Sequence, residues 1–76
     1  MAIKIYSTPT CAYCKMAKAF LKELKLDFED IDVSANAKAA EEMTEKTGQM
    51  AVPVIDINGI IIQGFDREAI TTALRS

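Results

Sequence analysis

Hydrophobic and polar residues follow two different periods along this chain, and the changes between them predict seven elements. Four short segments are rich in β-branched or aromatic residues, which is typical of strands: Ile3–Tyr6, Phe28–Val33, Val54–Ile57 and Ile60–Ile62. Two longer segments repeat apolar residues every three or four positions or are rich in helix-forming residues: Cys11–Lys25 and Ala35–Thr47. A third helix is capped by Asp66 and runs through Arg75. The predicted order is therefore βαβαββα.

The boundaries of the first two helices carry residues that commonly cap helices. Thr10 and Ser34 are candidate N-caps, because their side chains can accept a hydrogen bond from the first helical turn. Gly48 follows the second helix as its C′ residue. Within and just after that helix, Met43 and Met50 are expected to fill the core.

The last two strands and the last helix are joined by recognisable turn residues. Asn58-Gly59 is the dipeptide that most readily adopts the two positive φ angles of a type I′ turn, so the strands form a hairpin. Phe65 precedes the cap Asp66 and can pack on Ile70 as a hydrophobic staple.

The order of elements predicts one α/β domain spanning residues 1–76. A strand, a helix and a strand at this spacing form a right-handed βαβ unit, and the terminal hairpin extends its sheet antiparallel. The helices must then cover both faces of the sheet. A chain of 76 residues leaves no room for a second domain.

Composition and charge exclude several classes of function. The chain has nine Lys and Arg residues against eleven Asp and Glu residues, so it lacks the basic excess that drives binding to nucleic acids or anionic membranes. Its longest apolar run, Ile60–Ile62, is far shorter than the roughly 20 residues that cross a bilayer. The N-terminus does not have the pattern of a secretory signal, so we expect a cytoplasmic protein.

The absence of histidine directs attention to two thiols. Without histidine, the Ser-His-Asp and Cys-His mechanisms and every metal site that needs an imidazole are excluded. Cys11 and Cys14 form a C-x-x-C motif where the first strand gives way to the first helix, a context typical of redox motifs. The unpaired N–H groups and positive end of that helix favour the thiolate form of Cys11. We therefore predict that Cys11 is the nucleophile and Cys14 the resolving thiol.

Lysines near the motif have two interpretations. Lys15 and Lys18 either supply a positive field that stabilises the Cys11 thiolate, or belong to a solvated stripe that continues with Lys22 and Lys25.

The two thiols have two alternative roles besides redox chemistry, a structural disulfide and a zinc site. A structural disulfide would close only a short loop and stabilise little, and a zinc site would need two chains that each contribute two thiolates.

Three segments together resemble a glutaredoxin over nearly the whole chain. They are Tyr6-Ser7-Thr8-Pro9-Thr10-Cys11-Ala12-Tyr13-Cys14, Val52-Pro53 and Gly64-Phe65-Asp66. The resemblance is greatest to the small bacterial and archaeal members, including the NrdH-redoxins that donate electrons to ribonucleotide reductase. It implies a thioredoxin fold with a mixed sheet of order 2-1-3-4 and helices on both faces. It also implies a thiol–disulfide oxidoreductase that reduces protein disulfides or glutathione mixed disulfides.

The resemblance assigns substrate-binding roles beyond the cysteines. It implies that Pro53 follows a cis peptide bond and that the backbone of Val52 pairs with an incoming cysteine-containing chain. The further positions that match the family's binding surface are Thr8, Tyr13, Gly64, Phe65 and Asp66.

The chain also departs from the family pattern. Ala12 replaces the usual proline between the cysteines, and Thr8 stands where many members have a lysine that holds a glutathione carboxylate. The pair Gly64-Phe65 resembles the matching positions of redoxins that thioredoxin reductase reduces. The expected reductant is thus glutathione, as a co-substrate, or a thioredoxin-reductase-like flavoenzyme.

The expected assembly is a monomer without a tightly bound cofactor or metal. One alternative is a dimer in which Cys11 of two chains and two glutathione thiols hold a [2Fe–2S] cluster, which Ala12 leaves open. The other is a dimer bridged by zinc.

Overall fold

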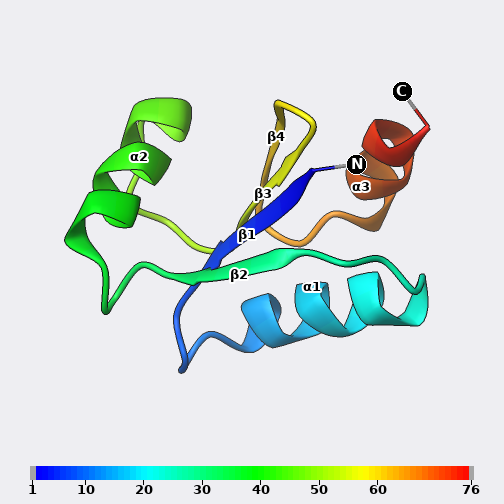
Figure 1. Ribbon diagram of the computed structural model, residues 1–76, viewed down its shortest axis with the longest axis horizontal. Coiled ribbons are helices and arrows are strands. Elements are labelled where there is room, and N and C mark those ends of the chain that lie inside the picture. The colour runs from blue at the N-terminus through cyan, green and yellow to red at the C-terminus, as the bar shows by residue number, and fades with distance from the viewer. Residues whose placement is uncertain (1, 76) are drawn as a thin grey trace.

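The computed structural model describes residues 2–75, and its elements follow the predicted order βαβαββα (Figure 1). The strands are β1 (Ile3–Ser7), β2 (Glu29–Asp32), β3 (Val54–Ile57) and β4 (Ile60–Gln63). The helices are α1 (Ala12–Glu23), α2 (Ala37–Thr47) and α3 (Arg67–Leu74). Within the described range, no helix combines the length and the apolar character needed to cross a membrane.

The four strands form one mixed sheet of order β2-β1-β3-β4, which confirms the expected thioredoxin-fold topology. β1 runs parallel to β2 and antiparallel to β3, and β4 pairs antiparallel with β3. In this register Ile5 lies between Asp30 on one side and Ile55 on the other.

Helices cover both faces of the sheet, because alternate strand residues point to opposite sides. On one face, strand residues such as Ile5 and Ile55 pack with Leu21 of α1 and Ile70 of α3. On the other face, a second cluster joins the sheet to α2: Tyr6, Val33, Ala39, Met43 and Val54. Figure 1 shows α2 separated from α1 and α3 by the sheet.

The N-cap predicted for α2 was wrong. Asn36 caps the helix, and its side chain accepts a hydrogen bond from the Ala39 amide at 3.1 Å. Ser34 lies two residues earlier and donates through its amide and hydroxyl to Asp32. At the other end Gly48 has φ 76°, which confirms the predicted left-handed C-terminal residue.

The hairpin and the start of α3 have the predicted local structure. Asn58 and Gly59 have φ angles of 51° and 92°, as a type I′ turn requires. Asp66 caps α3, and Phe65 before it packs against the core cluster that contains Ile70. The sequence therefore specified these boundaries through purely local interactions.

Polar side chains link α2 to the sheet. Lys46 of α2 donates to the Tyr6 hydroxyl at 3.0 Å and to the Asp56 carboxylate at 2.9 Å. The Tyr6 hydroxyl donates in turn to Glu42 at 3.1 Å. These hydrogen bonds raise the pKa of Lys46, which therefore keeps its charge.

The two methionines of the α2 region have opposite environments. Met43 is buried, as expected of a core residue. Met50 was expected in the core too, but it is 70% exposed, so that prediction was wrong. Met50 follows the end of α2 and precedes β3, where the loop keeps its side chain on the surface.

Candidate functional site

Cys11 occupies the N-cap position of α1, one residue after the predicted cap Thr10. Its backbone is extended, and its Sγ accepts a hydrogen bond from the Cys14 amide at 3.1 Å. A sulfur thus takes the place that a serine or aspartate oxygen usually has. The N–H groups of the first turn surround this sulfur with partial positive charge, an environment that suits a negatively charged sulfur.

Cys14 lies three residues further along α1 and is fully buried, whereas Cys11 is only partly buried. Burial is the main cause, and a hydrogen bond with the Cys11 side chain the second, of a raised pKa of the Cys14 thiol, which reaches about 11. The backbone of Thr8 and the charge of Lys18 act in the opposite direction. Cys14 is therefore a protonated thiol at neutral pH, and both cysteines are free.

The sheet register brings the three predicted segments to one end of the molecule. Tyr6, near the end of β1, pairs with Val54, and Val54 pairs with Gln63 at the end of β4. The Gly64 amide donates to the Pro53 carbonyl at 2.8 Å. The segments after β1, before β3 and after β4 therefore adjoin, as the resemblance implied.

The predicted residues near the cysteines differ in exposure. Thr8 is partly buried, and its carbonyl accepts the Cys11 amide at 3.3 Å. Tyr13 is 63% exposed and is available to a partner. The Val52–Pro53 peptide bond is cis, which confirms that expectation. Pro53 is buried. Val52 is partly buried and packs against the core cluster between the sheet and α2.

The segment after β4 turns directly into α3. Gly64 has φ 81°, and Asp66 accepts a hydrogen bond from the third amide of α3 at 3.1 Å. The ring of Phe65 contacts Phe20 of α1 edge-on, with 6.0 Å between centroids. The Arg67 guanidinium lies over both rings, at 5.4 and 5.7 Å from their centroids. Phe65 thereby joins α1 to this segment.

The two lysines near the motif, Lys15 and Lys18, have different environments. Lys18 donates to Asp30 at 2.9 Å in an ion pair, and Asp30 also accepts the Ser7 hydroxyl at 2.8 Å. Burial raises the pKa of Asp30, but the hydrogen bonds from Lys18 and Ser7 outweigh it and lower that pKa. Lys15 is exposed. An action of either lysine on Cys11 stays a prediction.

Ser7 and Asp30 were not predicted as neighbours of the site. Ser7 is buried at the end of β1, and Asp30 lies on the adjacent strand β2. Asp30 belongs to no motif, and Ser7 lies in the segment that resembles the family without a role of its own there. The only sequence signal was a serine directly before the cysteine loop, and its partner became evident only with the strand register.

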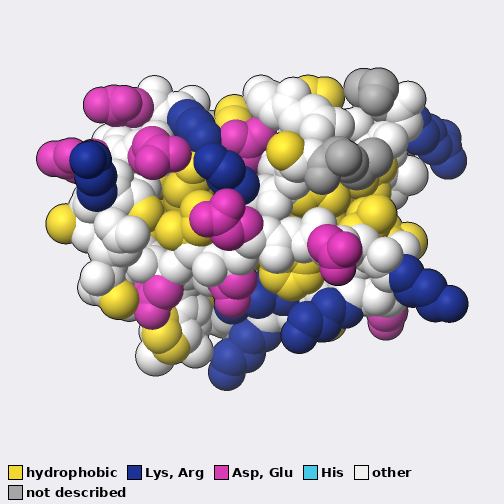
Figure 2. Space-filling view, in the orientation of Figure 1, with side chains coloured by type: hydrophobic (Ala, Val, Ile, Leu, Met, Phe, Trp, Pro, Cys, Tyr) yellow, Lys and Arg dark blue, Asp and Glu magenta, His cyan; other side chains and the backbone are white. Residues whose placement is uncertain are grey.

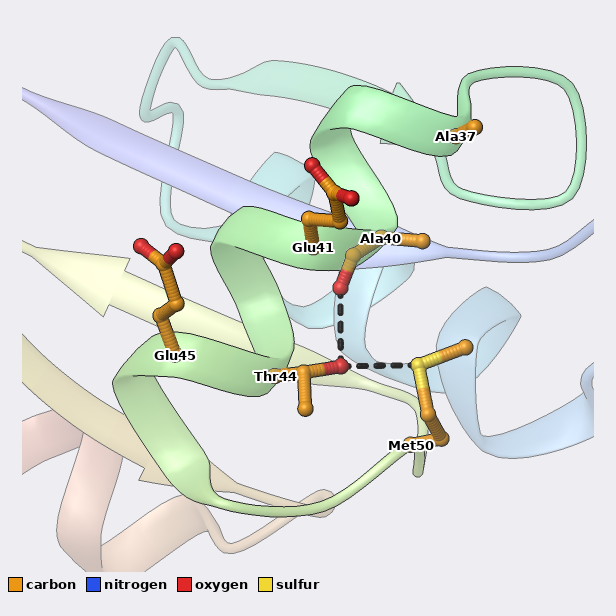
Figure 3. A pocket seen from close by; sticks show the side chains of 6 residues that line it. All are labelled: Ala37, Ala40, Glu41, Thr44, Glu45 and Met50. Carbon is orange, nitrogen blue, oxygen red and sulfur yellow. Dashed lines mark hydrogen bonds between the residues drawn. The ribbon is translucent and has the colours of Figure 1, made fainter.

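A hollow of about 540 Å³ lies between α2 and Met50 in the segment that follows this helix (Figure 3). Its lining residues are Ala37, Ala40, Glu41, Thr44, Glu45 and Met50. The Thr44 hydroxyl donates to the Ala40 carbonyl at 2.9 Å and lies 2.8 Å from the Met50 sulfur. The lining holds no thiol, so the hollow does not include either cysteine.

The arrangement at the cysteines is suited to thiol–disulfide exchange. It presents one accessible sulfur at a helix N-terminus and a second, buried thiol one turn away. Within residues 2–75, no three Cys, Asp or Glu side chains gather into a group that could hold a metal ion.

Comparison with known proteins gives a consistent result. The family model described as Glutaredoxin matches residues 3–62. The chain is 50% identical over 68 residues to a glutaredoxin-like 8.6 kDa protein in the rubredoxin operon of Clostridium pasteurianum, covering 90% of this chain and 91% of that protein. It is 38% identical over 64 residues to Glutaredoxin 3 of Escherichia coli K12, covering 84% and 77% respectively. The solved structure of the glutaredoxin-like NrdH-redoxin from Escherichia coli superposes with a TM-score of 0.86 at 28% identity, covering 95% and 93%.

Proposed function

This chain belongs to the glutaredoxin family of thiol–disulfide oxidoreductases, and we propose that Cys11 and Cys14 are the couple through which it reduces disulfides. The substrates are protein disulfides and mixed disulfides with glutathione, and the protein acts as a cytoplasmic monomer. The observation that carries this proposal is the difference between the two cysteines. Cys11 is partly exposed at a helix N-terminus, while Cys14 is buried and protonated.

The first step is attack by the Cys11 thiolate on the substrate disulfide. The Cys11 sulfur bonds to one substrate sulfur, the substrate S–S bond breaks, and the other sulfur leaves as a thiolate. The Cys14 amide donates a hydrogen bond to the Cys11 sulfur at 3.1 Å, and this bond and the helix N-terminus stabilise the negative charge on the attacking sulfur.

The second step releases the substrate. Cys14 loses its proton, which the departing thiolate takes up, and its sulfur attacks Cys11 in the mixed disulfide. An intramolecular Cys11–Cys14 disulfide forms, and the second substrate sulfur leaves. The substrate has then gained two electrons and the protein has lost two. Because the pKa of Cys14 is raised, this thiol stays protonated and does not compete as the first nucleophile.

A reductant must then restore the dithiol. We assign this role to a thioredoxin-reductase-like flavoenzyme, with glutathione as a less efficient co-substrate. Two observations support this choice: Thr8 stands in place of a cation for a glutathione carboxylate, and the similar NrdH-redoxin is described as having a thioredoxin-like activity profile. Parallel turnover with NADPH plus thioredoxin reductase, and with glutathione plus glutathione reductase, tests it. Faster turnover with glutathione would contradict the assignment.

The roles of the cysteines are tested by exchanging each for serine. We expect Cys11→Ser to lose reduction of a protein disulfide entirely. We expect Cys14→Ser to accumulate a mixed disulfide on Cys11, because the resolving thiol is missing. Intact-protein mass spectrometry after mixing with the disulfide substrate measures both results.

The matched control places serine elsewhere on the same helix. Ala19 is exposed on α1, so Ala19→Ser should retain the wild-type rate. Reduction by Cys11→Ser at the wild-type rate, or a mixed disulfide on Cys14 in place of Cys11, would reverse the assigned roles.

A further inference from the structure

Lys18 lies one turn after Cys14 on α1, and most of its side chain is covered. Residues four positions apart share one side of a helix, and Cys14 is on the side that faces the sheet. The Lys18 side chain is only 22% exposed, and its ammonium lies 2.9 Å from the Asp30 carboxylate of β2. The ammonium is therefore held between α1 and β2, on the side of the helix where Cys14 is buried.

The strand register explains why Asp30 faces α1. Asp30 pairs with Ile5 in the parallel ladder of β1 and β2, and paired residues point to the same face of a sheet. Ile5 packs in the core cluster that contains Leu21 of α1. Asp30 also accepts the hydroxyl of buried Ser7 at 2.8 Å, which fixes the carboxylate from a second side. Figure 2 shows basic side chains over α1 beside acidic side chains over β2.

The charged groups on the side of the sheet that Cys14 faces come from α1 and β2. The residues of β1 and β3 on this face carry no charge: Ile3, Ile5, Ser7, Ile55 and Ile57. On β2, Asp30 and Asp32 share the face, and their negative charges oppose a thiolate nearby. On α1, Lys15 is exposed to solvent, whereas Lys18 is held under the helix. The charges at the start of α3 have partners of their own: Asp66 and Arg67.

The second step of the proposed reaction places a negative charge on the Cys14 sulfur. Before this sulfur attacks, its thiol must lose a proton in a buried position, where the charged form is disfavoured. At that point Cys11 is bonded to the substrate and carries no charge, so its repulsion of a Cys14 thiolate is gone. The Lys18 ammonium is still present, and its charge lowers the pKa of Cys14.

We propose that the Lys18 ammonium, held in place by Asp30, stabilises the Cys14 thiolate in the second step and so accelerates release of the substrate. This inference rests on the proposed function, since it assigns part of that reaction to a residue outside the C-x-x-C motif. Lys18 transfers no proton: the Cys14 proton goes to the departing substrate thiolate, and the ammonium acts through its field. Asp30 is a positioning residue, because it keeps the ammonium against β2.

The ionisation of Cys14 in a Cys11→Ser background tests the proposal. The chain has two cysteines, so ¹³C-labelled cysteine then gives the signal of Cys14 alone, and its Cβ chemical shift follows ionisation as the pH is raised. We expect Lys18→Met to raise the midpoint of this titration by about 0.5 pH unit, which makes the thiolate population about threefold smaller below the midpoint. The change is modest because the Asp30 side chain is 46% exposed and water screens the pair.

The direction of the change separates charge from packing. If Lys18→Met only loosened the packing over Cys14, water would reach the thiol and the midpoint would fall. Lys18→Arg keeps the positive charge and should keep the midpoint of the parent protein. Lys22→Met removes the same charge from an exposed position one turn further along α1 and should leave the midpoint unchanged. Lys18→Met combined with Asp30→Asn leaves no unpaired carboxylate, and its midpoint should still exceed that of Asp30→Asn alone.

The rate of the second step is a separate measurement in protein that keeps both cysteines. Acid-quenched mass spectrometry follows the mixed disulfide on Cys11 after reaction with bis(2-hydroxyethyl) disulfide. With Lys18→Met this intermediate should decay about twofold more slowly. The change is smaller than that in the thiolate population, because a more basic thiolate is also a better nucleophile. With Lys22→Met the decay should match the wild type.

Four outcomes would overturn the inference. They are a Lys18→Met midpoint that is unchanged or lower, a Lys18→Arg variant that behaves like Lys18→Met, an effect that disappears in the Asp30→Asn background, or an unchanged decay of the mixed disulfide. If the wild-type protein forms no mixed disulfide on Cys11, the proposed function fails. The titration of Cys14 does not depend on turnover, so the two failures are distinguishable.

Discussion

At the scale of single residues, two identical side chains three positions apart have different chemistry because of where α1 begins. Cys11 caps the helix and accepts the Cys14 amide, so its sulfur remains at the surface end of the helix. Cys14 lies in the first turn on the side that faces the sheet and is fully buried. One turn of helix therefore divides the pair into an accessible sulfur and a protected one.

The raised pKa of Cys14 predicts how the stability of the reduced protein depends on pH. An unfolded cysteine releases its proton near pH 9, whereas folded Cys14 keeps it until about pH 11. The folded state binds the proton more tightly, so stability is fully present below pH 9 and is lost as the pH rises to 11. The expected loss is about 3 kcal/mol.

Urea unfolding of the reduced protein between pH 8 and 11 measures this loss, with Cys14→Ala as the control. Lys46 also titrates at high pH, but its contribution is the same in both proteins and cancels in their difference. Parallel stability curves for the wild type and Cys14→Ala would contradict the prediction.

At the scale of elements, the start of α2 shows how closely related cap candidates compete. Ser34 and Asn36 both have side chains suited to an N-cap. After β2 the chain turns so that the Ser34 hydroxyl and amide donate hydrogen bonds to the Asp32 carboxylate. These hydrogen bonds lower the pKa of Asp32. Asn36 is then the residue that reaches the first turn of the helix.

This competition predicts unequal effects of two alanine substitutions. Asn36→Ala should lower the free energy of unfolding by about 1 kcal/mol, because the Ala39 amide loses its partner. Ser34→Ala removes an exposed hydroxyl and should cost less than about 0.5 kcal/mol. Urea unfolding at neutral pH measures both variants. A larger loss for Ser34→Ala would mean that the helix begins earlier in solution.

At the scale of the whole molecule, α2 is held against the sheet by apolar packing and by the hydrogen bonds around Lys46. Asp56 is mostly buried, and burial raises its pKa, but hydrogen bonds from Lys46 and the Gly59 amide lower that pKa overall. The Lys46 ammonium also lies 5.2 Å from the centre of the Tyr6 ring. These contacts connect a helix, two strands and the hairpin turn.

Lys46→Met is therefore expected to destabilise the protein by about 1 to 2 kcal/mol, since it leaves the Asp56 carboxylate without its charged partner. Combined with Asp56→Asn, it should give a coupling energy of at least about 0.5 kcal/mol in a double-mutant cycle. The control Lys38→Met removes an exposed lysine from the same helix and should have little effect. If the double variant loses as much free energy of unfolding as the two single variants together, the two residues are not coupled.

The sequence by itself determined the elements, their order and the chemistry of the site. Hydrophobic periodicity, the Asn58-Gly59 turn and the caps Gly48 and Asp66 act through neighbouring residues, so their effects are visible without a partner. The C-x-x-C spacing likewise placed both thiols on one helical turn. The errors fell on Thr10, Ser34 and Met50.

Only the tertiary structure decided what depends on contacts between distant segments. The register of the sheet placed Pro53 and Gly64 side by side, next to the cysteine loop, and it brought Ser7 to Asp30. Packing of α1 on the sheet buried Cys14 and raised its pKa, and packing of α2 left Met50 outside. Burial and charge pairing depend on every segment that surrounds a side chain, so no local pattern in the sequence contains them.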